Sequence, residues 1–363
     1  MIVNCSRVKT AVGCCWRRGF NQYHRGVEGQ RSMNLVDGGA FHEALARGFA
    51  TPADKNWERA LADTRPKFDE GIAAAQLMPE QSFLAERHWQ IIEKMVQLYR
   101  ENFQKEEYQV LQPECNFDVA LPNSHHNCIW VHWWDREEQR DVWGPPPPDK
   151  ILRRAVVRPH PSNQASNCKC WQPHRLVGKA DALVKWRGCL WLMEHKTTAI
   201  AGEQFWSQWE LDIQPTTYMY GIWKSIGLLP HGFVLDAIYK PSEKQVAAWN
   251  NKRKYGPPQA VTDYMGYERQ AFLRTCEDLE RVESQYLDAC NEWERRIVEG
   301  SFPMNGIMGH GCMLYNRKCD YWTACLTHDD PKEFEALLPR PKDYVEDKRT
   351  ALLVQILARE EVR

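Results

Sequence analysis

The chain has 363 residues, of which 43% are hydrophobic and 26% are charged, and its formal net charge is −1. This balance is typical of a folded globular protein and excludes disorder along the whole chain. The sequence contains neither an apolar run of the ~18 residues that span a bilayer nor an N-terminal signal core, so we expect a cytoplasmic protein with no membrane partner.

The basic residues are unevenly distributed. Residues 1–32 and residues 145–175 each hold six Lys or Arg against one Asp or Glu, a net charge of +5 in each segment. Two such segments in a near-neutral protein can line a groove that follows nucleic-acid phosphates. They can equally form two solvated surfaces, and charge alone does not separate these interpretations.

In chain order, the sequence divides into six segments. They are a basic segment with conspicuous cysteines (1–35), a helical region with the first core strands (36–121), an insertion or long loop (122–175), a core ending in a long helix (176–300), a cysteine cluster (301–328) and a charged, helical tail (329–363).

Within these segments, hydrophobic spacing predicts individual elements. Residues 36–50 resemble a glycine-rich entry into a short helix, residues 82–104 an amphipathic helix, and residues 108–121 a strand. From Leu176 to Pro241 the pattern predicts strand, strand, helix and strand, and apolar residues at spacings of three and four predict a long helix at about 264–300.

The most informative stretch is a predicted hairpin. Two apolar runs flank Arg187 and Gly188, which indicates a tight turn. If these two residues form the turn, Asp181 lies directly opposite Glu194, with Cβ atoms ~5 Å apart. Lys196 shares the face of Glu194 because side chains alternate along a strand.

Two like charges in opposite positions are unfavourable unless something joins them. A divalent cation such as Mg²⁺ or Mn²⁺ would do so, and Lys196 could then orient or deprotonate a metal-polarised water or neutralise phosphate charge. The alternative is an exposed sheet face with a simple Lys–Glu pair.

These residues resemble the PD-(D/E)XK nuclease superfamily, and specifically its RecB-like branch, which includes phage-type and CRISPR-adaptation exonucleases. Gly178 to Asp181 matches the G-x-x-D pattern, and Glu194 to Lys196 matches (D/E)-x-K. Upstream, Gly39 to His42 is similar to the branch's G-x-x-H element, and downstream Gln214 to Tyr218 is similar to Q-x-x-x-Y. Taken without the resemblance, His42 is an ordinary helix-start residue and Gln214 and Tyr218 an ordinary amphipathic pair.

The resemblance implies an α/β fold with a central mixed sheet flanked by helices. It implies metal-dependent hydrolysis of DNA, with one or two Mg²⁺ or Mn²⁺ ions held by His42, Asp181, Glu194 and the carbonyl group of His195. Lys196 would position the attacking water, and Gln214 and Tyr218 would contact the strand. Pro215 places Gln214 at the very start of its helix, and the family's extra acidic residue corresponds to Glu114.

The implied substrates are single-stranded DNA or duplex ends, with a helicase or recombinase as a further partner. The implied setting is recombination, repair or phage DNA processing in a bacterial or phage-infected cell. Two other functions stay open at this point. One is a non-catalytic nucleic-acid-binding module that keeps the nuclease fold, and the other is a zinc-stabilised RNA-binding protein that uses its tryptophans.

The chain has 13 cysteines, an odd number, which argues against a disulfide framework. Cys312, Cys319 and Cys325 follow one another at spacings of seven and six. The resemblance implies that they join one N-terminal cysteine in an iron–sulfur staple: Cys14 by its spacing from Ser6, or Cys15 by its spacing from Phe20. Four thiolates suit a [4Fe–4S] cluster or Zn²⁺, and the resemblance favours the cluster; His310 could complete a zinc site.

A second group of potential metal ligands lies in the insertion. Its members are His125, His126, Cys128, Cys168, Cys170 and His174. Their spacing matches no strong zinc pattern, which favours an ordinary loop.

Overall fold

The structure is a computed structural model. It describes residues 2–23, 33–50, 56–74, 82–103, 108–121, 127–135, 140–144, 152–159, 174–200, 202–242, 245–246, 265–299, 301–302, 313–314, 317–319, 321–322 and 325. The chain forms two compact units. The first comprises residues 1–29, 118–177 and 280–363, and the second comprises residues 30–117 and 178–279.

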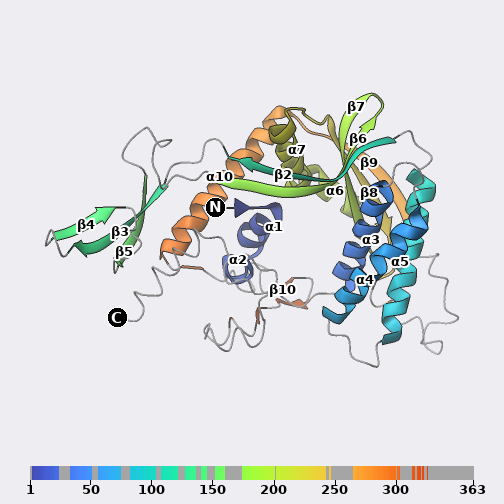
Figure 1. The fold of residues 1–363 in the computed structure, drawn as a ribbon, viewed down its shortest axis with the longest axis horizontal. Helices are drawn as coiled ribbons and strands as arrows, with labels where there is room; N and C mark the ends of the chain where they lie inside the picture. Colours follow the sequence, from blue (N-terminus) through green and yellow to red (C-terminus); the bar gives the residue numbers. More distant parts are fainter. Residues whose placement is uncertain are drawn as a thin grey trace. The chain divides into compact units, whose positions relative to one another are not determined.

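The second unit is organised around a mixed β-sheet (Figure 1). Its hydrogen-bonded order is β6–β7–β8–β9, with β2 also paired to β6. The β7–β8 pair is parallel, whereas β6–β7 and β8–β9 are antiparallel. The strands are β2 (Tyr108–Ala120), β6 (Arg175–Trp186), β7 (Cys189–Thr198), β8 (Gly232–Tyr239) and β9 (Gly266–Leu273).

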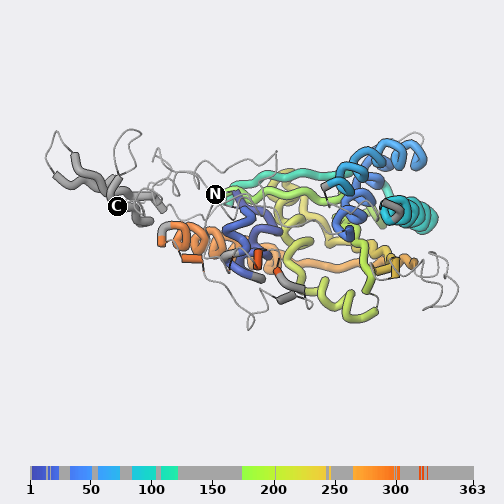
Figure 2. The backbone as a smooth tube through the Cα atoms, turned by 90° about the horizontal axis from the view of Figure 1, so that it is seen from below, coloured from blue at the N-terminus to red at the C-terminus, as the bar shows by residue number. Residues whose placement is uncertain are grey.

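Helices cover both faces of this sheet. Figure 2 shows α3, α4 and α5, in blue to cyan, on one side of the strands and α6, in yellow-green, on the other. A parallel strand pair needs a crossover connection, and α6 and α7 form it between β7 and β8. The helices are α3 (Met33–Ala50), α4 (Trp57–Ala74), α5 (Ser82–Phe103), α6 (Glu203–Leu211) and α7 (Ile213–Ile226).

Helix α5 illustrates why the helices pack where they do. Its buried residues Trp89, Ile92, Val96, Tyr99 and Phe103 recur every three or four positions and form one apolar face. This face belongs to the same core as buried residues of α3 and of strands β6, β7 and β8. The sequence therefore predicted this helix correctly.

A buried ionic network joins helix α3 to its neighbours. The carboxylate of Asp37 lies 2.9 Å from Nδ1 of His88 on α5 and accepts a hydrogen bond of 2.6 Å from Nζ of Lys240. All three side chains are at most 5% exposed. The backbone N–H of Lys240 also donates to the carbonyl group of Thr198, so the network ties α3 and α5 to the ends of β7 and β8.

The hairpin turn has the predicted position and register. Arg187 and Gly188 both have positive φ angles, 49° and 79°, as a two-residue turn between right-twisted strands requires. In the described hairpin, ladder pairs run from Trp186 and Cys189 to Ala182 and Met193 and end there. The predicted turn position and strand register are thus confirmed over five pairs.

An aromatic ring is wedged between β6 and α7. A Cβ atom added at Gly178 would lie 2.3 Å from the ring of Phe117, and one added at Gly221 would also lie 2.3 Å from it. Neither position can accept a side chain without moving the ring, which lies 6.0 Å from the ring of Tyr218 between centroids. The ring therefore fits between strand and helix because both facing positions are glycine.

The first unit holds the N-terminal segment and most of the last long helix. Phe20 stacks on Phe302 with 3.9 Å between ring centroids, and Arg7 lies 4.6 Å from the ring centre of Trp293. These contacts hold the N-terminal segment against the chain around the end of α10. The helices are α1 (Cys5–Val8), the π-helix η1 (Lys9–Cys14), α2 (Trp16–Tyr23) and α10 (Cys276–Glu299).

The remaining strands are short or lie in the predicted insertion. In the first unit, β1 pairs in parallel with Arg175 and Leu176 at the start of β6. A separate antiparallel sheet has the order β4–β3–β5, and β10 pairs with β11. The strands are β1 (Ile2–Val3), β3 (Asn127–Asp135), β4 (Arg140–Gly144), β5 (Leu152–Pro159), β10 (Met313–Leu314) and β11 (Arg317–Lys318).

The structure adds to one prediction of secondary structure and corrects three. Residues 122–175, predicted as an insertion or long loop, contain three strands, and their Trp and Val residues favour strands even without strict alternation. Residues 266–273 form β9, so the long helix begins only at Cys276. Two helices rather than one connect β7 to β8, and helix α3 begins at Met33 and extends through the glycine pair. The predicted helical tail (329–363) lies outside the described residues.

Among the helices of the described residues, none combines the length and apolarity that crossing a membrane demands.

Candidate active site

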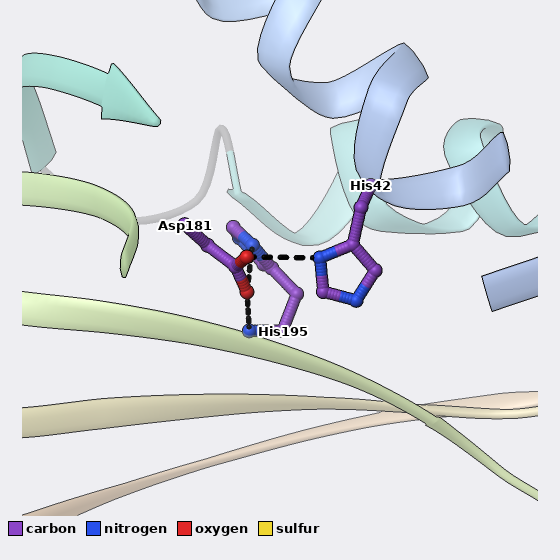
Figure 3. Close-up of side chains that lie close together, drawn as sticks. All are labelled: His42, Asp181 and His195. Carbon is purple, nitrogen blue, oxygen red and sulfur yellow. Dashed lines mark hydrogen bonds and ion pairs between the residues drawn. The ribbon is translucent and has the colours of Figure 1, made fainter. Parts of the chain in front are cut away.

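Asp181 stands where the hairpin of β6 and β7 opens. Its Oδ2 accepts a hydrogen bond of 2.8 Å from the backbone N–H of His195, and its Oδ1 lies 3.0 Å from Nδ1 of His42 on α3. Nδ1 of His195 lies 3.4 Å from Oδ2 of Asp181. Figure 3 shows the three side chains gathered around the Asp181 carboxylate.

The imidazole ring of His195 also makes contacts through its second nitrogen. Its Nε2 lies 3.0 Å from the hydroxyl group of Tyr99 on α5 and 3.9 Å from Oδ2 of Asp236 on β8. Asp236 in turn accepts hydrogen bonds from Arg269 at 2.5 Å and Tyr267 at 2.9 Å. A hydrogen bond at one ring nitrogen fixes the orientation of the other, so Tyr99 keeps Nδ1 of His195 directed at Asp181.

Glu194 and Lys196 lie on the opposite side of β7 from the His195 side chain, because successive residues of a strand alternate. The Lys196 ammonium group pairs with Oε1 of Glu194. Gln214 Nε2 donates to the same oxygen at 3.0 Å and to the Tyr218 hydroxyl group at 2.9 Å. The Lys196 nitrogen lies 5.5 Å from the centre of the Trp209 ring, within cation–π range.

Burial and charge shift the pKa values of these groups. Burial raises the pKa of Glu194, and Lys196 offsets this only in part. Burial alone would lower the pKa of Lys196, but Glu194 and Asp181 hold it above its usual value. Burial would likewise raise the pKa of Asp181, yet His42 and His195 hold it well below its usual range. Perturbed titratable groups that cluster in this way are typical of functional sites.

The donor atoms fit a divalent cation. One ligand atom from each of His42, Asp181 and His195 lies within 4.8 Å of the others. The Glu194 side chain is 2% exposed, and its Oε2 is buried without a hydrogen-bond partner among the described residues. Leaving such an oxygen unsatisfied costs about 1–3 kcal/mol, and a cation satisfies it. Imidazole nitrogens and carboxylate oxygens are both ligands for Mn²⁺, and carboxylates also for Mg²⁺.

The structure brings the predicted site residues of the second unit into one neighbourhood but changes two contacts. Asp181 and Glu194 do not form a ladder pair as predicted, because the strands part after Ala182 and Asp181 accepts from the His195 backbone instead. We predicted only the carbonyl group of His195 as a ligand, whereas here its imidazole joins the ligand group. Gln214 is the second residue of α7, as Pro215 led us to expect.

The residues that support the site were not predicted from the sequence. Tyr99 fell within the predicted amphipathic helix at 82–104 without a role of its own, and Trp209 and Asp236 were not singled out. Asp212 was also missed; its carboxylate caps α7 by accepting from the Gln214 N–H at 2.7 Å. An Asp one position before a helix is a known N-cap signal, so Asp212 alone could have been found from sequence.

A cavity of about 460 Å³ opens beside the site, between α3 and α4. His42, Asp181 and His195 form part of its wall. Glu114, the predicted extra acidic residue, also lines it and forms an ion pair with Lys179 rather than contacting the Asp181 group.

The proposed iron–sulfur ligands are only partly described. Cys312, and the side chain of Cys14, lie outside the described residues. Cys15 is buried in the first unit, and Cys319 and Cys325 are half-buried. The cluster therefore stays a prediction. In the second cysteine and histidine group, only the His174 side chain is described; its Nδ1 lies 3.9 Å from the Glu294 carboxylate.

Two residues of the basic segments have internal roles. Arg7 is buried and donates to the carbonyl group of Ile2 at 2.7 Å. Arg175 pairs with Asp118 at 2.7 Å. The charge that these segments can offer to phosphates is thus lower than the sequence count.

The sequence and the fold were compared with those of known proteins. Among curated proteins, none matches this sequence. Among solved structures, one similar chain is the crystal structure of a "Putative exonuclease" from Eubacterium rectale, 11% identical, with a TM-score of 0.44, over 89% of this chain and 92% of that chain. A likeness at this level carries no argument about function. Residues 3–326 match the family described as the PD-(D/E)XK nuclease superfamily. Since that match covers most of the sequence, the chain belongs to the PD-(D/E)XK nuclease superfamily.

Proposed function

We propose that this chain is a metal-dependent deoxyribonuclease that hydrolyses phosphodiester bonds from DNA ends, as an exonuclease of recombination, repair or phage DNA processing. The observation that carries the proposal is the convergence of His42, Asp181 and His195 beside buried Glu194 and its half-buried partner Lys196. Family membership supports a nuclease, and these residues supply the chemistry that a nuclease needs.

Each residue has a proposed role in this reaction. His42, Asp181 and His195 would hold one Mg²⁺ or Mn²⁺ ion, and Glu194, on the other side of β7, would take part in holding a second. A bound ion of this kind activates water and stabilises charge on phosphate. Lys196, close to Glu194 and backed by Trp209, would place a positive charge where the phosphate gains negative charge.

Gln214 and Tyr218 form the remaining proposed contact with the strand. The Gln214 side chain already bridges Glu194 and the Tyr218 hydroxyl group. It would therefore keep Glu194 in place while Tyr218 faces the substrate.

A cleavage assay tests the proposal directly. Purified protein would be incubated with Mg²⁺ or Mn²⁺ and with linear single-stranded, linear duplex and circular single-stranded DNA. An exonuclease degrades the linear substrates, spares the circle and stops in EDTA. Lys196→Ala should lower cleavage by about 10²-fold or more, whereas Lys185→Ala, an exposed lysine on β6, should leave it unchanged.

The possible failures are distinct. Full activity of Lys196→Ala, in protein free of contaminating nuclease, overturns the site. Cleavage of the circle makes the enzyme an endonuclease, and cleavage of RNA alone refutes the DNA assignment.

We also propose that Cys14 (or Cys15), Cys312, Cys319 and Cys325 bind a [4Fe–4S] cluster. Anaerobically purified protein should then be brown, absorb near ~400 nm and contain iron and sulfide. A colourless protein that contains stoichiometric zinc would replace the cluster with a zinc site.

A further inference from the structure

The cavity beside the site is mostly apolar. Its volume of about 460 Å³ is within the range of ~300–1,000 Å³ that small-molecule sites occupy. Leu35 on its wall is 68% exposed although it is a large hydrophobic residue. The apolar wall includes Leu35, Val36, Ala40, Leu45, Phe49 and Phe68.

The polar groups of this cavity lie around the apolar wall and at its catalytic end. Lys67 pairs with Glu43, and Lys179 pairs with Glu114. His42, Asp181 and His195 line the cavity as well. A ligand with a flat, weakly polar part and an adjoining phosphate would place the flat part against the apolar wall and the phosphate at the catalytic residues.

Gly39 contributes no side chain to this cavity. It lies inside the 18-residue helix α3, where glycine is less favourable than any ordinary residue except proline. A Cβ atom at Gly39 would meet no atom within 4 Å, and Gly39 itself lines the cavity. Packing thus does not require a glycine at position 39, but a longer side chain there would occupy part of the cavity.

We propose that this cavity binds the base of the nucleotide beside the scissile phosphate of an unpaired DNA strand. The inference rests on the proposed nuclease function and narrows its substrate to single strands and frayed ends. A base can enter this cavity only when it is neither paired nor stacked in a duplex. Contact of an unpaired base with the apolar wall of the cavity contributes favourable binding free energy.

The first experiment fills the cavity. Gly39→Leu is compared with Asn34→Leu, which adds the same side chain to an exposed position of α3 outside the cavity wall. Binding of a short fluorescein-labelled oligodeoxythymidylate is followed by anisotropy in EDTA, and its cleavage is followed with Mn²⁺. Gly39→Leu should weaken both by at least about 10-fold without lowering the unfolding temperature, and Asn34→Leu should behave as wild type.

The second experiment removes the base instead of the space. Oligonucleotides that carry a single abasic nucleotide at successive positions are cleaved by the wild type and by Gly39→Leu. The wild type should be several-fold slower when the abasic nucleotide adjoins the scissile bond. Gly39→Leu should not distinguish the two substrates, because its cavity holds no base.

The outcomes separate this inference from the proposed function. If the wild type cleaves DNA but neither Gly39→Leu nor the abasic nucleotide has an effect, the cavity does not bind a base. Faster cleavage of blunt duplex than of single strands also overturns the inference. If the wild type cleaves no DNA, the proposed function fails, and the anisotropy arm still decides on the cavity: affinity lost in Gly39→Leu supports base binding, and unchanged affinity refutes it.

Discussion

The side chains on the two sides of β7 differ in burial and in contacts, although they come from neighbouring residues. On the α5 side, the His195 ring is 2% exposed and held between Asp181 and Tyr99. On the α7 side, Lys196 is 25% exposed and linked through Glu194 to Gln214. The α5 side thus holds buried candidate metal ligands, and the α7 side holds a partly exposed positive charge. Strand alternation alone allows a three-residue motif to serve both.

Asp181 offers the strongest way to break this division, because it touches the histidine side and its charge reaches Glu194 and Lys196. Asp181→Asn should lower DNA cleavage by roughly 10³-fold, since it removes a ligand and the partner of two histidines. Steady-state cleavage rates measure the loss. Activity within a few-fold of wild type would show that the two sides work without it.

Glu194 tests the α7 side more selectively. Glu194→Gln keeps the shape of the side chain but removes the charge that pairs with Lys196, and cleavage should fall by about 10²-fold. Glu268→Gln on β9 is a matched control, because that carboxylate accepts from Trp206 and Tyr239 away from the site. Equal losses in the two variants would mean that the effect is general destabilisation.

Tyr99 tests the α5 side without a change to any proposed ligand residue. Tyr99→Phe preserves the buried ring and removes the hydroxyl group beside His195, so the Mn²⁺ concentration needed for half-maximal activity should rise by about 10–100-fold. Tyr239→Phe removes a hydroxyl group that bonds to Glu268 instead, and its metal dependence should match wild type. An unchanged metal requirement in Tyr99→Phe would remove His195 from the ligand group.

The smallest effect on catalysis is expected for the ionic network beneath α3. Asp37→Asn leaves buried His88 and Lys240 without their carboxylate, so the free energy of unfolding should drop by about 3 kcal/mol. The rate per folded molecule should change little, because Asp37 is not part of the ligand group. Urea denaturation and cleavage measured on the same preparation check both expectations, and a collapse of activity with intact stability contradicts them.

The sequence predicted this site well where short-range geometry decides. Strand alternation placed Lys196 on the face of Glu194, the two-residue turn set the hairpin register, and the spacing of four placed Gln214 beside Tyr218. The link between Tyr99 and His195 spans 96 positions, and no local pattern encodes it.

Errors in secondary structure have similar causes. Phe272 continues the spacing of the long helix and so was assigned to it, but its ring stacks on Phe233 of the neighbouring strand, with 4.8 Å between centroids. A single apolar residue three or four positions before a helix can belong to a strand that ends just before that helix. Tertiary pairing decides such cases, and it is invisible in a local window.

The ring of Phe117 between Gly178 and Gly221 has a consequence for protein engineering. The glycine of the G-x-x-D pattern here is explained by steric fit to an aromatic neighbour rather than by chemistry. A transplant of the hairpin into a foreign scaffold would therefore have to carry Phe117 and the glycine of the facing helix along with it. A side chain in place of either glycine would collide with the ring and push the strand that carries the aspartate away from its helix, and loss of the ring would leave a gap between them.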